Sequence, residues 1–349
     1  MTILYLNFTK NIHARDAVYL NGLKENGVKI IECIDSTPGW GKYKRLYKEI
    51  KKRNNNYDFV MVGYTGHVLV PLAKLASQKP IIFNALASLY EGIIISRSQA
   101  SKLSFKSLYV WLIDFISFRL SKIVLVESNA QRIFLSKKFL LPPQKFLVTW
   151  TGVDENEFKY NPEIKKISDF TVLFRGGFLP ESGIEYAIEA AEILKGEDVK
   201  FRILGSGQME NLVKQKLNSF DSKNVEWIKE KLPMKELITK MQECHLSLGQ
   251  LSNHDRLKRT IPHKAFESLA LKLPYLTARN EGVMELLEEN KTCLACNPAD
   301  PHDLAKKILW VKTHKTEVEK ITETGYDLLH IKLSPCILAK KLLNNLDVK

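Results

Sequence analysis

Short apolar segments of strand length recur along the whole chain and alternate with helix-length patterns. The first series comprises residues 3–6, 28–32, 59–62, 80–83, 123–126 and 146–149. A second series follows residues 165–169, which we interpret as a linker, and comprises residues 171–174, 201–204, 225–231, 245–248 and 275–277. Apolar strands alternating with helices are typical of parallel sheets covered by helices. The chain is therefore predicted to be an α/β protein with two Rossmann-like βαβ domains.

The size and composition of the chain agree with two domains. With 349 residues, 45% of them hydrophobic, the chain has enough apolar side chains for two cores. The N-terminal apolar run is too short for a signal peptide, and the longest apolar stretch, residues 103–120, is interrupted by charged residues. We therefore expect a cytoplasmic protein.

Cysteine usage gives no sign of a metal site. The five cysteines are an odd number, which fits reduced thiols. Cys293 and Cys296 form a CxxC pair, but no second pair or nearby histidine completes a tetrahedral set. We interpret both as packing residues at a strand end and expect no metal.

Positive charge is concentrated in the first half of the chain. Residues 1–160 hold 23 Lys and Arg against 12 Asp and Glu, whereas residues 161–349 hold 29 against 27. Such a charge attracts nucleic acid, an anionic membrane surface or a phosphorylated acceptor, and it also serves solubility alone. We expect no nucleic acid partner, because the sequence contains neither a zinc-finger spacing nor a basic strand interleaved with aromatics.

Two helices could serve either a core or a membrane. Residues 42–53 place Tyr43, Leu46, Tyr47 and Ile50 on one face, and seven of the twelve residues are Lys or Arg. This helix could lie on an anionic bilayer or cover the sheet with a solvated basic back. Residues 103–120 are apolar on most faces, so that helix is expected to be buried or to meet lipid.

The stretch 257–289 contains the clearest candidate ligand site. Pro262 is followed by a helical pattern and then by the strand at 275–277, with a second acidic helix expected over 281–289. Glu267 falls about one turn into the first helix, where nearby backbone amides keep a carboxylate ionised. Such a carboxylate could accept two hydroxyl hydrogen bonds from a ribose, or it could be an exposed residue of an ordinary amphipathic helix.

The order R-x-x-P-x-K-x-x-E in residues 259–267 resembles the nucleotide-binding segment of retaining glycosyltransferases of the two-Rossmann (GT-B) fold, specifically family 4. The resemblance implies two Rossmann-like domains facing across a cleft: residues 1–164 for the acceptor and 165–334 for the nucleotide sugar. It also implies that a C-terminal helix, residues 335–349, crosses back to the first domain. In this family Glu267 would hold the ribose, and Arg259 stands where a sugar-binding glutamate is usual.

The same resemblance assigns further residues to the donor. The turn RGGFLPESG carries Arg175, Gly176 and Gly177, and a second strand ends at Gly205. Glycines at such turns let a phosphate approach backbone amides. Most members have an Arg and a Lys where this chain has Gly177 and Ser182, so the diphosphate charge is left to Arg175, Lys258, Arg259 and Lys264.

Acceptor-side candidates follow the first and fourth strands. His13, Arg15 and Asp16 lie in and after the first loop, although Arg15 and Asp16 could simply begin a helix. The later run resembles a family pattern S-L-Y-acidic-x5-R, with Asn84 and Glu91 at positions where Asp is usual. The acceptor-side residues of this run are Ser88, Tyr90 and Arg97.

The resemblance implies a retaining, metal-independent hexosyltransferase that moves a sugar from a nucleotide diphosphosugar to an acceptor hydroxyl in glycan or glycolipid synthesis. Glu91, Arg259 and Lys264 are the candidate catalytic residues. No cofactor is expected beyond the donor, and the acceptor would be a glycan or a lipid-linked sugar, with peripheral attachment to the inner membrane face left open. The alternative is a non-catalytic nucleotide-binding protein of the same fold. A dinucleotide oxidoreductase is disfavoured because neither glycine turn has the required spacing.

Overall fold

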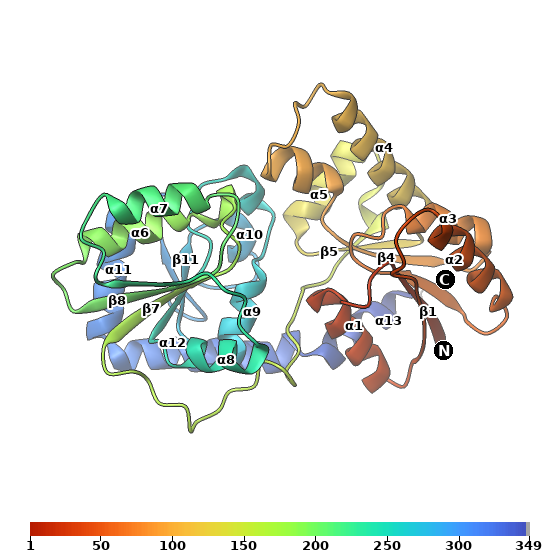
Figure 1. Cartoon of the computed structure of the whole chain (residues 1–349). Coiled ribbons are helices and arrows are strands. Elements are labelled where there is room, and N and C mark those ends of the chain that lie inside the picture. The colour runs from red at the N-terminus through yellow and green to blue at the C-terminus, as the bar shows by residue number, and fades with distance from the viewer. Residues whose placement is uncertain (347–349) are drawn as a thin grey trace. The chain divides into compact units, whose positions relative to one another are not determined.

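The computed structural model describes residues 1–346, which form two compact units (Figure 1). The first unit comprises Met1–Asp154 together with the chain from Lys332 onward, and the second comprises Glu155–Ile331. The unit boundary therefore lies ten residues before the predicted one. Residues 347–349 of the predicted C-terminal helix lie outside the described residues.

The first unit contains a six-stranded parallel sheet in the order β2-β1-β3-β4-β5-β6. The strands are β1 (Thr2–Asn7), β2 (Lys29–Ile34), β3 (Phe59–Val62), β4 (Ile81–Leu86), β5 (Ile123–Val126) and β6 (Phe146–Val148). The helices are α1 (Ala14–Glu25), α2 (Gly41–Lys52), α3 (Leu69–Ala76), α4 (Phe105–Leu120), α5 (Asn129–Phe139) and α13 (Pro335–Leu346). A π-helical segment, Glu91–Ser96, follows β4.

Helices cover both faces of this sheet, because successive strand residues point to opposite sides. One core joins α2, α3, α4 and α5 to alternate strand residues, and the other joins α1 and α13 to the remaining ones. The close approach of α1 and α13 requires Gly22, where a Cβ would lie 1.9 Å from the carbonyl oxygen of Pro335. The C-terminal helix thus completes the first unit.

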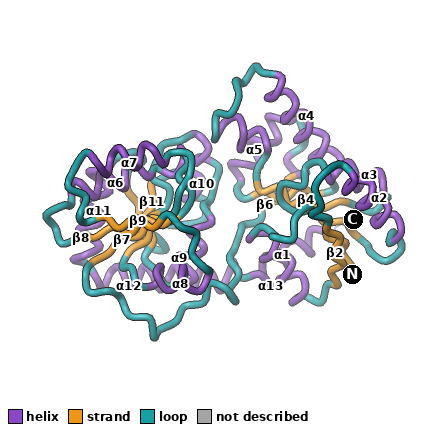
Figure 2. Tube along the Cα trace, viewed as in Figure 1, coloured by secondary structure: helices purple, strands orange, loops and turns teal. Residues whose placement is uncertain are grey.

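The second unit repeats the design with a six-stranded parallel sheet in the order β12-β11-β10-β7-β8-β9. Its strands are β7 (Phe170–Arg175), β8 (Val199–Leu204), β9 (Val225–Ile228), β10 (Leu246–Leu248), β11 (Tyr275–Ala278) and β12 (Leu294–Cys296). Its helices are α6 (Ile184–Ile193), α7 (Glu210–Asn218), α8 (Met234–Gln242), α9 (His263–Ala270), α10 (Glu281–Met284), α11 (Pro301–Thr313) and α12 (Lys315–Leu328). Figure 2 shows helices flanking the strands of each unit. The prediction of two Rossmann-like domains is confirmed.

Two helix predictions need correction or refinement. The acidic helix expected over 281–289 is only the short α10, because the chain turns after Met284 and Glu289 bridges to Cys293. In α2, Leu46 and Ile50 are buried against the sheet, so its apolar stripe belongs to the core. In α4, by contrast, many apolar side chains are exposed.

Candidate functional site

Two glycine turns meet at the carboxyl ends of β7 and β8. The Gly176 N–H donates to Leu204 O at 3.0 Å, and a Cβ on Gly205 would lie 2.1 Å from Gly176 O. Both glycines have positive φ values, 131° and 145°, so this close approach suits glycine alone. A Cβ on Gly177 would meet only Leu179 within 4 Å. In parallel sheets this edge is where ligands bind.

Arg175 and Glu267 form an ion pair beside these turns. Arg175 ends β7, and its Nη1 donates to Glu267 Oε2 from α9. The other carboxylate oxygen, Oε1, lies 3.0 Å from His263 Nδ1. Burial lowers the pKa of Arg175 to about 10. Glu267 is only 3% exposed, so the alternative of an exposed helix residue is wrong.

Lys264 brings a second buried cation to the same place. Its Nζ lies 3.4 Å from Gly249 O and 4.3 Å from the centre of the Phe174 ring. A Cβ on Gly176 would lie 3.8 Å from this nitrogen, so the ammonium group faces the glycine turn. Burial, and next the charge of Arg175, lower the pKa of Lys264 to about 7. A site with Arg175, Lys264 and one carboxylate is suited to an anion.

The basic pair before α9 is held differently. Arg259 Nη2 lies 2.7 Å from Asp255 Oδ2, whereas Lys258 is exposed and its Nζ lies 3.8 Å from Asp255 Oδ1. Asp255 and His263 were missed as partners of the site residues. Each stands four residues before its partner, Arg259 or Glu267, so helical spacing could have indicated both pairs.

At the carboxyl edge of the first sheet, Arg15 and Asp16 lie in a closed polar network. Both side chains are 0% exposed. Asp16 accepts from Tyr5 Oη at 3.0 Å, from the Tyr64 N–H at 2.9 Å and from Asn84 Nδ2 at 2.5 Å. Arg15 Nε donates to Asn84 Oδ1 at 2.7 Å.

The guanidinium of Arg15 also reaches the end of the sheet, since its Nη2 donates to Thr149 Oγ1 at 2.8 Å. The sequence left two alternatives for Arg15 and Asp16: contact with an acceptor, or exposed positions in the first turn of a helix. In this structure neither side chain is exposed, so neither alternative describes the arrangement. The two side chains join α1 to β1 and β4 and to the segments that follow β3 and β6. A direct role toward an acceptor stays a prediction.

The other first-unit candidates surround the turn after β4. Glu91 is 1% exposed, its N–H donates to Ser88 Oγ at 3.0 Å, and Gln131 Nε2 donates to its Oε2 at 3.4 Å. Tyr90 is buried beneath Lys138 Nζ, at 4.0 Å from the ring centre, whereas Arg97 is exposed.

His13 caps α1. Burial, and next the charge of Arg15, lower the pKa of His13 to about 4.

Asp114 is a residue of this region that sequence reasoning missed. It lies in α4 and accepts the N–H groups of Leu89 at 2.9 Å and Tyr90 at 2.8 Å. Its Oδ1 also lies 3.3 Å from Nε2 of the buried His67. Burial raises the pKa of Asp114 to about 8. A lone Asp within an apolar helix was the available signal.

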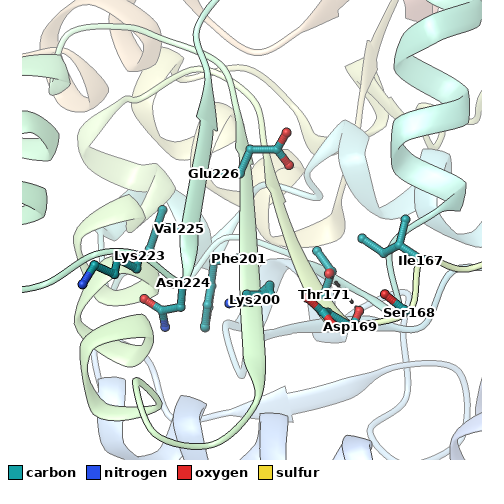
Figure 3. A pocket seen from close by; sticks show the side chains of 10 residues that line it. All are labelled: Ile167, Ser168, Asp169, Thr171, Lys200, Phe201, Lys223, Asn224, Val225 and Glu226. Atoms are coloured by element: carbon teal, nitrogen blue, oxygen red, sulfur yellow. Dashed lines mark hydrogen bonds between the residues drawn. The ribbon is translucent and has the colours of Figure 1, made fainter.

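The hollow drawn in Figure 3 lies elsewhere. Its lining residues include Thr171, Phe201 and Val225, at the beginnings of β7, β8 and β9. It therefore opens at the amino ends of the strands, opposite Gly176 and Gly205. We do not assign it to the candidate site.

The described part of the chain contains neither a metal-binding cluster nor a membrane-spanning helix. Within residues 1–346, no group of three or more His, Cys, Asp and Glu side chains is placed to hold a metal ion. None of the helices in that range combines the length and apolar character needed to cross a bilayer.

Part of the chain matches a known family model. The family model described as glycosyl transferases group 1 matches residues 156–328, nearly the whole second unit. A curated relative, the putative colanic acid biosynthesis glycosyltransferase WcaL of Escherichia coli, is 24% identical over 254 residues, covering 71% of this chain. The chain spans 60% of the length of that relative.

Solved structures agree over the whole chain. Anabaena Alr3699/HepE, solved in complex with UDP and glucose, matches with a TM-score of 0.75 and 14% identity, covering 100% of both chains. Sucrose-phosphate synthase from Thermosynechococcus elongatus matches with a TM-score of 0.74 and 10% identity, covering 99% of this chain and 98% of that one. The chain therefore has the GT-B glycosyltransferase fold, and its residues 156–328 match the family model of the glycosyl transferases group 1.

Proposed function

We propose that this protein is a retaining glycosyltransferase that moves a hexose from a nucleotide diphosphosugar to an acceptor hydroxyl in exopolysaccharide or related glycan synthesis. The observation that carries the proposal is the surplus of cations beside the glycine turns, where Lys264 is buried and Arg175 is partly buried. Arg175 and Lys264 meet there with Glu267 as the neighbouring carboxylate. The colanic acid annotation of WcaL and the UDP bound to HepE support the choice of reaction and donor class.

In the proposed reaction, stabilisation of the leaving diphosphate is the main task. The donor phosphates would lie over Gly176 and Gly205, with Lys264 and Arg175 as fixed positive groups. Fixed donors aimed at developing charge supply several kcal/mol of transition-state stabilisation. When the acceptor attacks from the face that the diphosphate leaves, a phosphate oxygen can take the hydroxyl proton, so no side-chain base is required.

Glu267 would hold the ribose hydroxyls in this scheme. Its two carboxylate oxygens have more acceptor capacity than Arg175 and His263 occupy in this structure. Arg259, held by Asp255, would stand near the donor as a further cation. We propose that transfer needs no metal ion, so a chelator should leave the rate unchanged.

On the acceptor side, we assign the turn that contains Ser88, Tyr90 and Glu91 to a glycan or lipid-linked sugar. Arg97, which is exposed, could contact an acceptor phosphate. The excess of basic residues in the first half of the chain favours work at the inner, anionic face of a membrane.

Nucleotide binding tests the donor assignment. We expect UDP to raise the melting temperature more than GDP or ADP, since a ligand at 100 times its Kd adds about 2.7 kcal/mol to the free energy of unfolding. Glu267→Ala should abolish the UDP shift, and Glu267→Gln should keep part of it. Glu289→Ala, which breaks a different Arg–Glu pair in the same unit, is the control. An unchanged UDP shift in Glu267→Ala would remove the ribose role.

A non-catalytic nucleotide-binding protein is the second candidate. It is favoured by the Arg175–Glu267 pair, which occupies the ribose carboxylate, and by the chain having Gly177 and Ser182 at the usual cation positions. The two candidates differ in turnover. A protein that binds UDP but neither hydrolyses nor transfers any UDP-sugar, with glycan acceptors present, would be of this second kind.

A further inference from the structure

Helix α4 buries three polar side chains together with Val110 and Phe118, and it exposes a row of large apolar side chains. Ser107, Asp114 and Ser117 are at most 2% exposed. The outward side chains are large and apolar, and their exposure falls steadily along the helix from its beginning: Leu103 99%, Phe105 93%, Leu108 62%, Tyr109 62%, Leu112 46% and Ile116 37%. We call these six residues the α4 ridge. The ridge therefore projects furthest at Leu103 and Phe105.

The exposure of the ridge does not come from a loosely attached helix. Asp114 binds the backbone of Leu89 and Tyr90, and Ser117 Oγ donates to His67 O at 2.7 Å. Trp111 stacks on Phe139 of α5, with 5.8 Å between the ring centres. The inner face is thus firmly held, so the orientation of the outer apolar face is fixed.

The part of the sequence that contains the ridge exposes no acidic side chain. Residues 92–153 include nine Lys and Arg, and their two acidic residues, Asp114 and Glu127, are 0% and 2% exposed. Lys102 and Lys106 flank the projecting tip, and both are exposed. An apolar face with cations beside it fits the acyl boundary and phosphates of anionic lipid.

A second copy of this chain fits the ridge less well. A two-fold interface brings identical surfaces together, so Lys102 and Lys106 of two copies would approach each other. Like charges brought together in this way oppose association.

We propose that α4 docks tip first on an anionic lipid bilayer, with Leu103 and Phe105 in the acyl boundary and Lys102 and Lys106 at the lipid phosphates. This inference rests on the membrane-side part of the proposed function and names the element that makes the contact. Helix α2 has Leu46 and Ile50 in the core, so it offers only its basic back.

The test is co-sedimentation of the full chain with phosphatidylcholine vesicles, with and without phosphatidylglycerol, in the absence of nucleotide and acceptor. Wild type should bind only the anionic vesicles. Leu103→Ser with Phe105→Ser should bind at least about tenfold more weakly, since burial of each side chain contributes more than a kcal/mol. Both side chains are more than nine-tenths exposed, so the fold should persist, with an unchanged melting temperature.

Leu75→Ser is the matched control, because Leu75 is a 77% exposed leucine of α3 in the same unit. It should bind as wild type does. Lys48→Glu with Lys51→Glu and Lys52→Glu should reduce binding only at low salt. As a direct readout, Phe105→Trp should show a blue-shifted emission on anionic vesicles and quenching by brominated acyl chains.

Three results would overturn the proposal: no binding of wild type to anionic vesicles, equal binding of the double serine variant, or a wild-type dimer that this variant dissociates. The last result would assign the ridge to a second copy. Because the assay contains no sugar donor, its failure leaves UDP binding and transfer untouched. Conversely, a missing UDP shift would leave the vesicle result standing.

Discussion

The carboxyl ends of the two sheets carry polar clusters of similar residues but different balance. At the first sheet, the charges of Arg15 and Asp16 are both buried, and Asn84 and Tyr5 complete a closed set of hydrogen bonds. At the second sheet, Arg175 pairs with the carboxylate of Glu267, whereas the Nζ of Lys264 lies 3.4 Å from a neutral carbonyl oxygen, that of Gly249. The first cluster is satisfied by the protein itself, and the second has charge left for a ligand.

The protonation of Lys264 depends on its place in the second cluster. Lys264 sits beside another cation in a buried place, so its ammonium form is disfavoured until an anion arrives. A bound diphosphate would supply that anion and raise the pKa of Lys264 again. Balance within a buried cluster thus separates a structural role from a binding role.

The largest effect is expected from breaking the balanced cluster. Asp16→Ala leaves the Arg15 charge and three donors without their acceptor. Removal of one partner from a buried ionic network typically costs about 3–5 kcal/mol in the free energy of unfolding. Urea denaturation measures this cost. Asp35→Ala, which breaks a surface pair with Arg45, should have little effect, and equal losses in the two variants would contradict the distinction.

The next effect concerns the surplus charge of the second cluster. Lys264→Met should weaken nucleoside diphosphate binding by about 1.5–3 kcal/mol, the range for a lost charged hydrogen bond, and leave nucleoside binding nearly unchanged. Arg259→Ala should act in the same direction but less, because Asp255 already offsets its charge. Calorimetric titration with UDP and uridine measures both. An equal loss for the two ligands would count against a phosphate contact.

The smallest effect, taken over one pH unit, is a pH dependence with opposite signs for stability and binding. The pKa of Lys264 falls from 10.5 to about 7 on folding, so between these values the unfolded chain binds more protons. Stability therefore rises with pH across this window, by at most about 1.4 kcal/mol per unit. UDP affinity should fall over the same window, by at most about tenfold per unit, because the diphosphate favours charged Lys264.

Lys264→Met provides the check on this assignment. Both pH slopes should shrink in that variant, which has no group to titrate at this position. If wild type and variant show the same slopes between pH 7 and pH 9, other groups are responsible.

Local sequence signals predicted the framework of the fold well. Residues 59–62 and 123–126 are apolar runs of strand length between turns, and both are strands with those bounds. The helices α7 and α8 were missed, because each is short and rich in lysine, with few buried side chains.

The candidate site was less accessible to sequence reasoning, because its contacts join distant residues. Arg15 and Asn84 are 69 residues apart, and Arg175 and Glu267 are 92 apart. No local spacing indicates such pairs. The resemblance gathered Arg175, Lys264 and Glu267 into one site, but it could not show that Arg15 and Asp16 are sealed. Nor can periodicity tell which side of an apolar helix such as α4 faces inward.

Helix α4 also sets the distance between the proposed membrane contact and the turn after β4. Phe105 at the projecting tip and Asp114 under the turn after β4 are nine residues apart, which corresponds to about 13 Å of helix at 1.5 Å per residue. Asp114 accepts hydrogen bonds from the amides of Leu89 and Tyr90. In the proposed docked state, the length of α4 therefore fixes the distance between the bilayer and the turn that contains Glu91. The height above the lipid at which this turn works is then a property of one helix, and insertion of a helical turn in α4 would lift it by about 5 Å.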